Sequence, residues 1–195
     1  MIPAFLLIVA AVAYRIVTGF AITSGTTWLS NFAPMAAIAL CGAAYFPVRY
    51  KFTVPLIALF ISDIVLNIHY SAPMLDPLIG CRYLALIVVG LLGLALANRA
   101  SWKTLLPASL AGSVLFYVIT NAFAWLSDPG YAKNFAGLVQ ALTVGLPQYS
   151  ATPSWMFFRN SVLSDLFFTG LFILCMKWGR TPALARASSA LPRPV

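Results

Sequence analysis

Six long apolar runs, separated by short polar connections, constrain this chain more than any other feature. An α-helix needs roughly 20 apolar residues to cross a bilayer, and it satisfies its own backbone hydrogen bonds there. The sequence therefore predicts an all-α integral membrane protein with six transmembrane helices. The expected helices cover about Pro3–Phe20, Ala33–Phe46, Phe52–Ile68, Leu78–Ala97, Thr104–Leu126 and Ser161–Met176.

The composition supports a membrane protein and argues against a nucleic-acid partner. Hydrophobic residues make up 62% of the 195 residues and charged residues only 8%, whereas soluble domains carry about 25% charged residues. A net charge of +8 could indicate nucleic-acid binding. The basic residues are instead scattered through short connections, which is typical of membrane topology. The expected surroundings are a lipid bilayer, with no nucleic acid.

The basic residues also predict the orientation of the helices. The connections between the apolar runs alternate between the two sides of the membrane. On one side they carry only two basic residues, Lys133 and Arg159, and Arg82 at the start of the fourth run adds a third basic residue. By the positive-inside rule the more basic side is cytoplasmic, so both termini are expected inside. Eight basic residues fall on that side: Arg49, Lys51, Arg99, Lys103, Lys177, Arg180, Arg186 and Arg193.

The chain is expected to form one transmembrane domain over residues 1–179, followed by a flexible basic cytoplasmic tail over 180–195. The second apolar run is short and contains Pro34, which indicates local thinning of the bilayer or partial insertion. Phe135–Leu146 is too short to span and predicts an extra short helix in the last outer loop. Gln148–Trp155 lacks a helical period and has the composition of an ordered lid or binding loop.

Asp63 lies inside the third apolar run, where an ionised side chain costs about 2.5–3.5 kcal/mol at the helix centre. Asn67 and Tyr70 follow four and seven residues later, so the three share one helix face. This face is either part of a binding site in the outer half of the protein or a structural clamp between helices. Arg15 and Arg159 are the candidate partners for such a clamp.

Arg15 and the start of the sixth run pose similar alternatives. Arg15 can reach the outer surface or pair with Asp63 or Asp165. Arg159, Asn160 and Asp165 predict a polar wall of an outward-facing site. Arg159 and Asn160 also fit a helix start, with Asn160 as the N-cap and Arg159 at the headgroups, and the two interpretations are compatible.

Cys81 is the one cysteine at the depth of these polar residues, because Cys41 lies mid-run and Cys175 near the inner end. The neighbouring Arg82 favours a thiolate, and a thiolate is a soft ligand for late transition metals. Taken alone, however, a lone cysteine in an apolar protein is usually just a small buried apolar residue. The single His69 gives no zinc-site spacing. The chain has no phosphate-binding loop, so any ATP-driven step would need another subunit.

Several segments resemble small bacterial membrane proteins related to the substrate-binding S-components of energy-coupling-factor (ECF) transporters. They are Asn31–Pro34 leading into an Ala-rich helix, PLIALFISDIVL, TNAFAWL and FFRNSVLSDLFFTGLF, which together extend over roughly residues 30–175. With Cys81 added, the chain most resembles the BtuM-type group of solitary S-component-like proteins. The first helix lacks the A-x-x-x-A pattern of S-components that share an ECF module, which fits a solitary transporter and not a standard ECF ATPase partner.

The resemblance implies a function and a location. It implies a multi-pass protein of the bacterial inner membrane that binds cobalamin, as substrate and not as a resident cofactor, in an outward-facing pocket and mediates its uptake. Cys81 would be the cobalt ligand and would act in thiol-assisted decyanation of cyanocobalamin. No other cofactor is expected. The candidates for hydrogen bonds to the corrinoid are Asp63, Asn67, Tyr70, Tyr83 and Arg159.

Three alternatives to a cobalamin transporter stay open from the sequence. The same scaffold could carry another vitamin or small molecule, with Cys81 as a packing residue. The protein could be primarily a corrinoid-processing membrane enzyme. It could also be a membrane assembly factor that binds no small ligand.

Overall fold

The computed structural model describes residues 2–23, 32–73 and 76–189, with side chains for residues 2–21, 32–73 and 76–178. The described chain is built from helices, with no strand among these residues. Two 3-10 turns, η2 (Val48–Tyr50) and η3 (Ala97–Arg99), connect neighbouring α-helices. The α-helices are α1 (Ile2–Thr23), α2 (Met35–Tyr45), α3 (Thr53–His69), α4 (Pro77–Ala95), α5 (Trp102–Ser127), α6 (Phe135–Leu142) and α7 (Ser154–Ser189).

Five of the helices are long and apolar enough to cross a membrane: α1, α3, α4, α5 and α7. These five agree with five of the predicted spans, because length and composition alone decide whether a helix can cross. The remaining predicted span corresponds to α2, which has only 11 residues. At 1.5 Å per residue it is about 16 Å long, roughly half the thickness of the hydrocarbon core.

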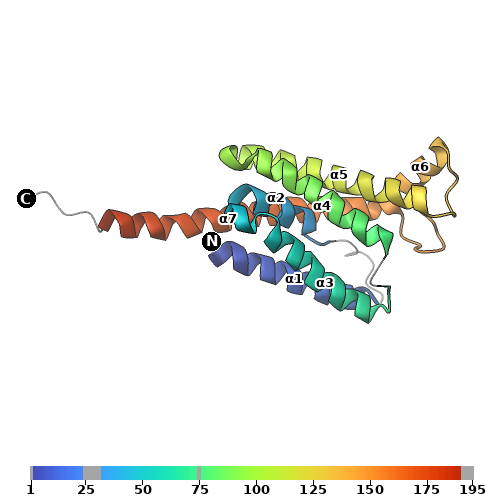
Figure 1. Ribbon diagram of the computed structural model, residues 1–195, viewed down its shortest axis with the longest axis horizontal. Coiled ribbons are helices and arrows are strands. Elements are labelled where there is room, and N and C mark those ends of the chain that lie inside the picture. The colour runs from blue at the N-terminus through green and yellow to red at the C-terminus, as the bar shows by residue number, and fades with distance from the viewer. Residues whose placement is uncertain (1, 24–31, 74–75, 190–195) are drawn as a thin grey trace, which may run out of the picture.

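The helices form a bundle in which α2 is enclosed by protein (Figure 1). In this view α1 and α3 pack together on one flank and α4 and α5 on the other, with α2 and α7 between them. The turns η2 and η3 lie at the end where α1 begins, which we call the basic end because it carries Arg49 and Arg99. The opposite end carries α6, and we call it the α6 end (Figure 1).

Every residue of α2 from Met35 to Ala44 is buried, so this helix has no lipid-facing side. Its small residues allow close approach to neighbouring helices. The closest approach is to Gly93 of α4, where a Cβ atom would lie 2.1 Å from the carbonyl oxygen of Leu40. A helix buried on all sides carries no amphipathic pattern, which explains why α2 resembles a membrane span in the sequence.

The last helix differs most from its predicted bounds. α7 begins at Ser154 and not at Ser161, so Asn160 lies inside the helix and the prediction that it is an N-cap is wrong. α7 continues to Ser189, which makes residues 180–189 of the expected loose tail helical, while 190–195 lie outside the described residues. The predicted short helix between α5 and α7 is present as α6, and the side chain of Asn134 caps it by accepting from Gly137 N at 2.9 Å.

Candidate functional site

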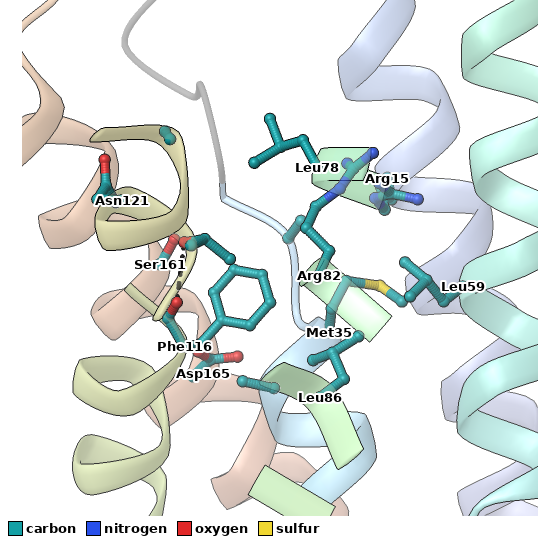
Figure 2. Close-up of a pocket in the computed structure, with 14 residues that line it drawn as sticks. Arg15, Met35, Leu59, Leu78, Arg82, Leu86, Phe116, Asn121, Ser161 and Asp165 are labelled. Atoms are coloured by element: carbon teal, nitrogen blue, oxygen red, sulfur yellow. Dashed lines mark hydrogen bonds between the residues drawn. The ribbon is translucent and has the colours of Figure 1, made fainter. Parts of the chain in front are cut away.

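A cavity of about 260 Å³ lies on the α6 side of α2 (Figure 2). Met35 and Ala36, at the start of α2, contribute to its lining, so the half-length helix forms its floor. The remaining walls come from α1, α3, α4, α5 and α7. The lining residues from those helices and from the segment before α2 are Arg15, Ala33, Leu59, Leu78, Arg82, Leu86, Phe116, Thr120, Asn121, Ala124, Ser161 and Asp165.

A second cavity of about 220 Å³ adjoins the first and shares Arg15, Ala33 and Arg82 with it. Its own lining is more polar and comes mostly from α1 and α3. Asp63, Asn67 and Tyr70 all belong to this lining, so the face predicted from their spacing does converge on one cavity. The hydroxyl group of Tyr70 also donates to Gly19 O at 2.6 Å, which joins α3 to α1.

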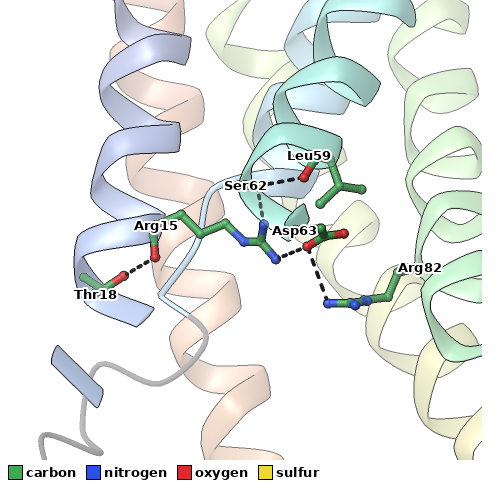
Figure 3. A network of polar contacts seen from close by, with 6 residues as sticks. All are labelled: Arg15, Thr18, Leu59, Ser62, Asp63 and Arg82. Carbon is green, nitrogen blue, oxygen red and sulfur yellow. Dashed lines mark hydrogen bonds and ion pairs between the residues drawn. The ribbon is translucent and has the colours of Figure 1, made fainter. Parts of the chain in front are cut away.

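An ion cluster borders both cavities (Figure 3). Arg15 Nη2 lies 2.7 Å from Asp63 Oδ1, and Arg15 Nη1 donates to Ser62 Oγ. Arg82 Nη1 lies 3.9 Å from the same Asp63 oxygen. The side chain of Asp63 is only 6% exposed, and its ionised form needs such partners at this depth. The predicted pairing of Arg15 with Asp63 is therefore confirmed, and Asp63 combines the structural and the cavity-lining roles.

Asp165 of α7 holds the N-terminus of α2 from the opposite wall of the first cavity (Figure 2). Its Oδ1 accepts a hydrogen bond from Ala37 N at 3.0 Å, a backbone group that has no partner within α2. The residue before α2 is Pro34, which offers no side-chain cap. Asp165 thus does from another helix what a local N-cap residue usually does.

The hydrogen bonds of Ser113 in α5 bear on the protonation state of Asp165. The Ser113 hydroxyl group lies 2.8 Å from Asp165 Oδ2 and 3.0 Å from Ser109 O. It has one hydrogen and can donate fully to only one of the two oxygens. If it donates to the carbonyl group of Ser109, both contacts are hydrogen bonds only when Asp165 is protonated and donates to Ser113. A neutral acid also avoids burying a charge that has no basic partner among the described residues.

Three other predicted site residues, Cys81, Tyr83 and Arg159, lie outside the linings of the two cavities. Cys81 is 8% exposed, and its Sγ lies 3.8 Å from Ile119 O in the contact between α4 and α5. Tyr83 is partly buried against the hydrophobic core. Arg159 is exposed on α7, where its Nη2 donates to Asn160 Oδ1 at 3.2 Å and its guanidinium group lies 5.8 Å from the centre of the Trp155 ring.

Arg82 and Asn121 are cavity residues that were not predicted as part of a site. In the sequence Arg82 enters the orientation count and stands beside Cys81, but a cation within the first turns of an apolar helix is itself a sign of function. Asn121 is the one side-chain amide in the fifth run and carries a weaker signal of the same kind. Phe116 and Met35 carried none, because apolar residues that line a cavity look like any others in an apolar sequence.

No curated protein and no solved structure shows significant similarity to this chain. The resemblance to S-component-like and BtuM-type proteins therefore stays a prediction. One family profile extends over residues 1–186, nearly the whole sequence, and its description assigns no activity. The chain belongs to the family of unknown function DUF6580.

Proposed function

We propose that this protein binds a small organic solute at the two adjoining cavities and mediates its uptake across a bacterial inner membrane. The observation that carries the proposal is the cavity pair on the α6 side of the buried half-helix α2. Ligand sites of membrane carriers lie near the bilayer midplane, where discontinuous helices expose their termini. Here the N-terminus of α2 lies inside the protein, at a cavity that is also lined by polar side chains from four other helices.

The orientation of this site follows from the basic residues. With the basic end in the cytoplasm, the cavities face the outside, and α2 blocks the path inward. We expect a fluorescent protein fused after Val195 to fluoresce in the cytoplasm of a bacterial host. We also expect a single cysteine introduced at exposed Lys133 to react with a membrane-impermeant maleimide in intact cells. Labelling at Lys133 only after lysis would reverse the orientation and contradict an outward-facing site.

A corrinoid is the ligand that the resemblance suggests, and the position of Cys81 is compatible with that proposal. Cys81 lies on α4 between Leu78 and Arg82, both of which line the first cavity. A corrinoid is larger than either cavity, and each is below the range of about 300–1,000 Å³ that is usual for drug-sized ligands. Binding therefore requires the cavities to join. Coordination by Cys81 also requires α4 to separate from α5, because the thiol faces Ile119 of α5.

Substitution of Cys81 by serine tests the cobalt-ligand proposal. We expect the protein purified from cells grown with cobalamin to be coloured and to show a thiolate-ligated cobalt spectrum. Cys81→Ser should lose that spectrum because a serine hydroxyl is a hard, poor ligand for cobalt. Cys175→Ser is the matched control, since Cys175 lies near the basic end of α7 and is partly exposed. The measurement is the visible absorption spectrum, together with corrinoid quantification by mass spectrometry.

Three outcomes separate the alternatives. A colourless wild-type preparation without corrinoid would reject cobalamin and leave a different solute on the same scaffold. Bound corrinoid with an unchanged spectrum in Cys81→Ser would remove Cys81 from the site. Release of cyanide in detergent, without corrinoid-dependent growth of a host that lacks its own importer, would favour a corrinoid-processing enzyme.

A further inference from the structure

The four acidic residues of this chain leave one cation at the cavities without a counter-charge. Arg15 forms an ion pair with Asp63, and the sequence contains no glutamate. The other three carboxyl groups accept from backbone N–H groups, and Asp165, the one of them that lines the first cavity, forms no ion pair with Arg82 among the described residues. Asp76 accepts from Leu78 N at 2.8 Å, Asp128 from Gly130 N at 2.7 Å and Asp165 from Ala37 N at 3.0 Å.

Arg82 is the cation that remains. Its Nη1 lies 3.9 Å from Asp63 Oδ1, the oxygen that Arg15 already contacts at 2.7 Å. Its Nε is buried and has no hydrogen-bond partner among the described residues. Residues 24–31, which lie outside the described part, contain no acidic side chain that could neutralise it. Two guanidinium groups thus share one carboxylate, and the cluster carries a net charge of +1.

An uncompensated cation in the outer half of a membrane protein is costly, and such residues mark substrate or ion pathways. The side chain of Arg82 is 31% exposed and lines both cavities, so an incoming solute can reach it. A guanidinium group presents a planar set of donors that matches the oxygens of a phosphate group. The buried Nε is one donor of this group that has no partner within the described part of the chain.

We propose that Arg82 is the anion-binding residue of this site and holds a phosphate group of the solute. This inference rests on the proposed function, since it concerns the same two cavities. In a cobalamin molecule the group that fits is the phosphodiester of the nucleotide loop. Arg15 stays with Asp63 and Ser62 and keeps α1 and α3 in place.

The first experiment does not depend on corrinoids. Inorganic phosphate is titrated into the protein in a non-ionic detergent, and the midpoint of thermal unfolding is followed. At saturating phosphate we expect a rise of about 2–4 °C in the wild type. The rise should be lost in Arg82→Gln and reduced in Arg82→Lys, which keeps the charge but not the planar donor set. Arg49→Gln, an exposed charge removal at the basic end, should behave as the wild type.

The second experiment compares cobalamin with cobinamide, a corrinoid without the nucleotide loop and its phosphodiester. The wild type should bind cobalamin about 10–100-fold more tightly, as expected for hydrogen bonds to a charged group. Arg82→Gln should lower the affinity for cobalamin to that for cobinamide and leave cobinamide binding unchanged. Both affinities are measured by quenching of tryptophan fluorescence.

The outcomes separate the two proposals. Phosphate protection that depends on Arg82, with no binding of either corrinoid, would reject the corrinoid and keep the anion site. Equal phosphate protection in the wild type and Arg82→Gln would overturn the anion site, as would equal loss of both corrinoids. A co-purified anionic phospholipid that disappears in Arg82→Gln would assign Arg82 to a lipid headgroup and would also overturn it.

Discussion

Replacing Asp165 with alanine should lower the free energy of unfolding in detergent by about 2–4 kcal/mol. Alanine leaves Ala37 N without its acceptor at the buried N-terminus of α2. It also opens a small void next to the first cavity, and Ser113 loses one of its two partners. The measurement is the shift of the unfolding transition relative to the wild type.

Asp165→Asn is the matched variant, and we expect it to retain most of the stability. Its amide oxygen can accept from Ala37 N, while its NH₂ group can donate to Ser113 Oγ as a protonated carboxyl group would. The comparison of the two variants therefore tests whether the Asp165 carboxyl group is protonated. A loss in Asp165→Asn as large as that in Asp165→Ala would mean that α2 requires an ionised carboxylate and that Ser113 is the donor.

Replacing Gly93 with alanine should destabilise the bundle by about 3 kcal/mol, because the added Cβ atom meets backbone. It would lie 2.1 Å from Leu40 O and 2.9 Å from Leu40 C, and no side-chain rotation can relieve those contacts. α4 and α2 would have to separate along their shared contact. We expect a lower unfolding midpoint and a smaller monomeric fraction in size-exclusion chromatography.

Gly80→Ala on the same helix is the control for that substitution. Nothing lies within 4 Å of a Cβ atom at Gly80, so the change introduces no clash. Alanine in a helix is favoured over glycine by about 0.5–1 kcal/mol, so this variant should be as stable as the wild type or slightly more stable. Equal losses from both substitutions would show that the contact between α2 and α4 is not the cause.

The sequence predicted the long helices because the energetic requirement for crossing a bilayer depends on local composition. The pairing of Arg15 with Asp63 was also accessible, since two opposite charges at similar depth have few alternatives. The start of α7 was not, because Arg159 and Asn160 interrupt the apolar run between Ser154–Phe158 and the predicted span. Without its partner helices, α2 could not be distinguished from a short span.

The position of the candidate site along the helices was predictable from the sequence, but the side chains that line it were not. Cys81 and Arg82 are adjacent in sequence, yet α-helical geometry turns their side chains about 100° apart. Arg82 faces the cavities, and Cys81 faces α5. Which of the two directions is the binding side depends on where α1, α3 and α5 lie. The partnership between Asp165 and α2 joins residues 128 positions apart, and no local pattern reports it.

That long-range partnership has a consequence for biogenesis. A ribosome that makes this protein delivers α2 early and α7 last, since chains are synthesised from the N-terminus. Until α7 emerges, the backbone N–H group of Ala37 at the N-terminus of α2 lacks its carboxyl acceptor. The half-helix is therefore expected to settle only after translation has passed Asp165. Truncated chains that end before this residue should be recognised by membrane quality control and degraded, even though most of their apolar helices are complete.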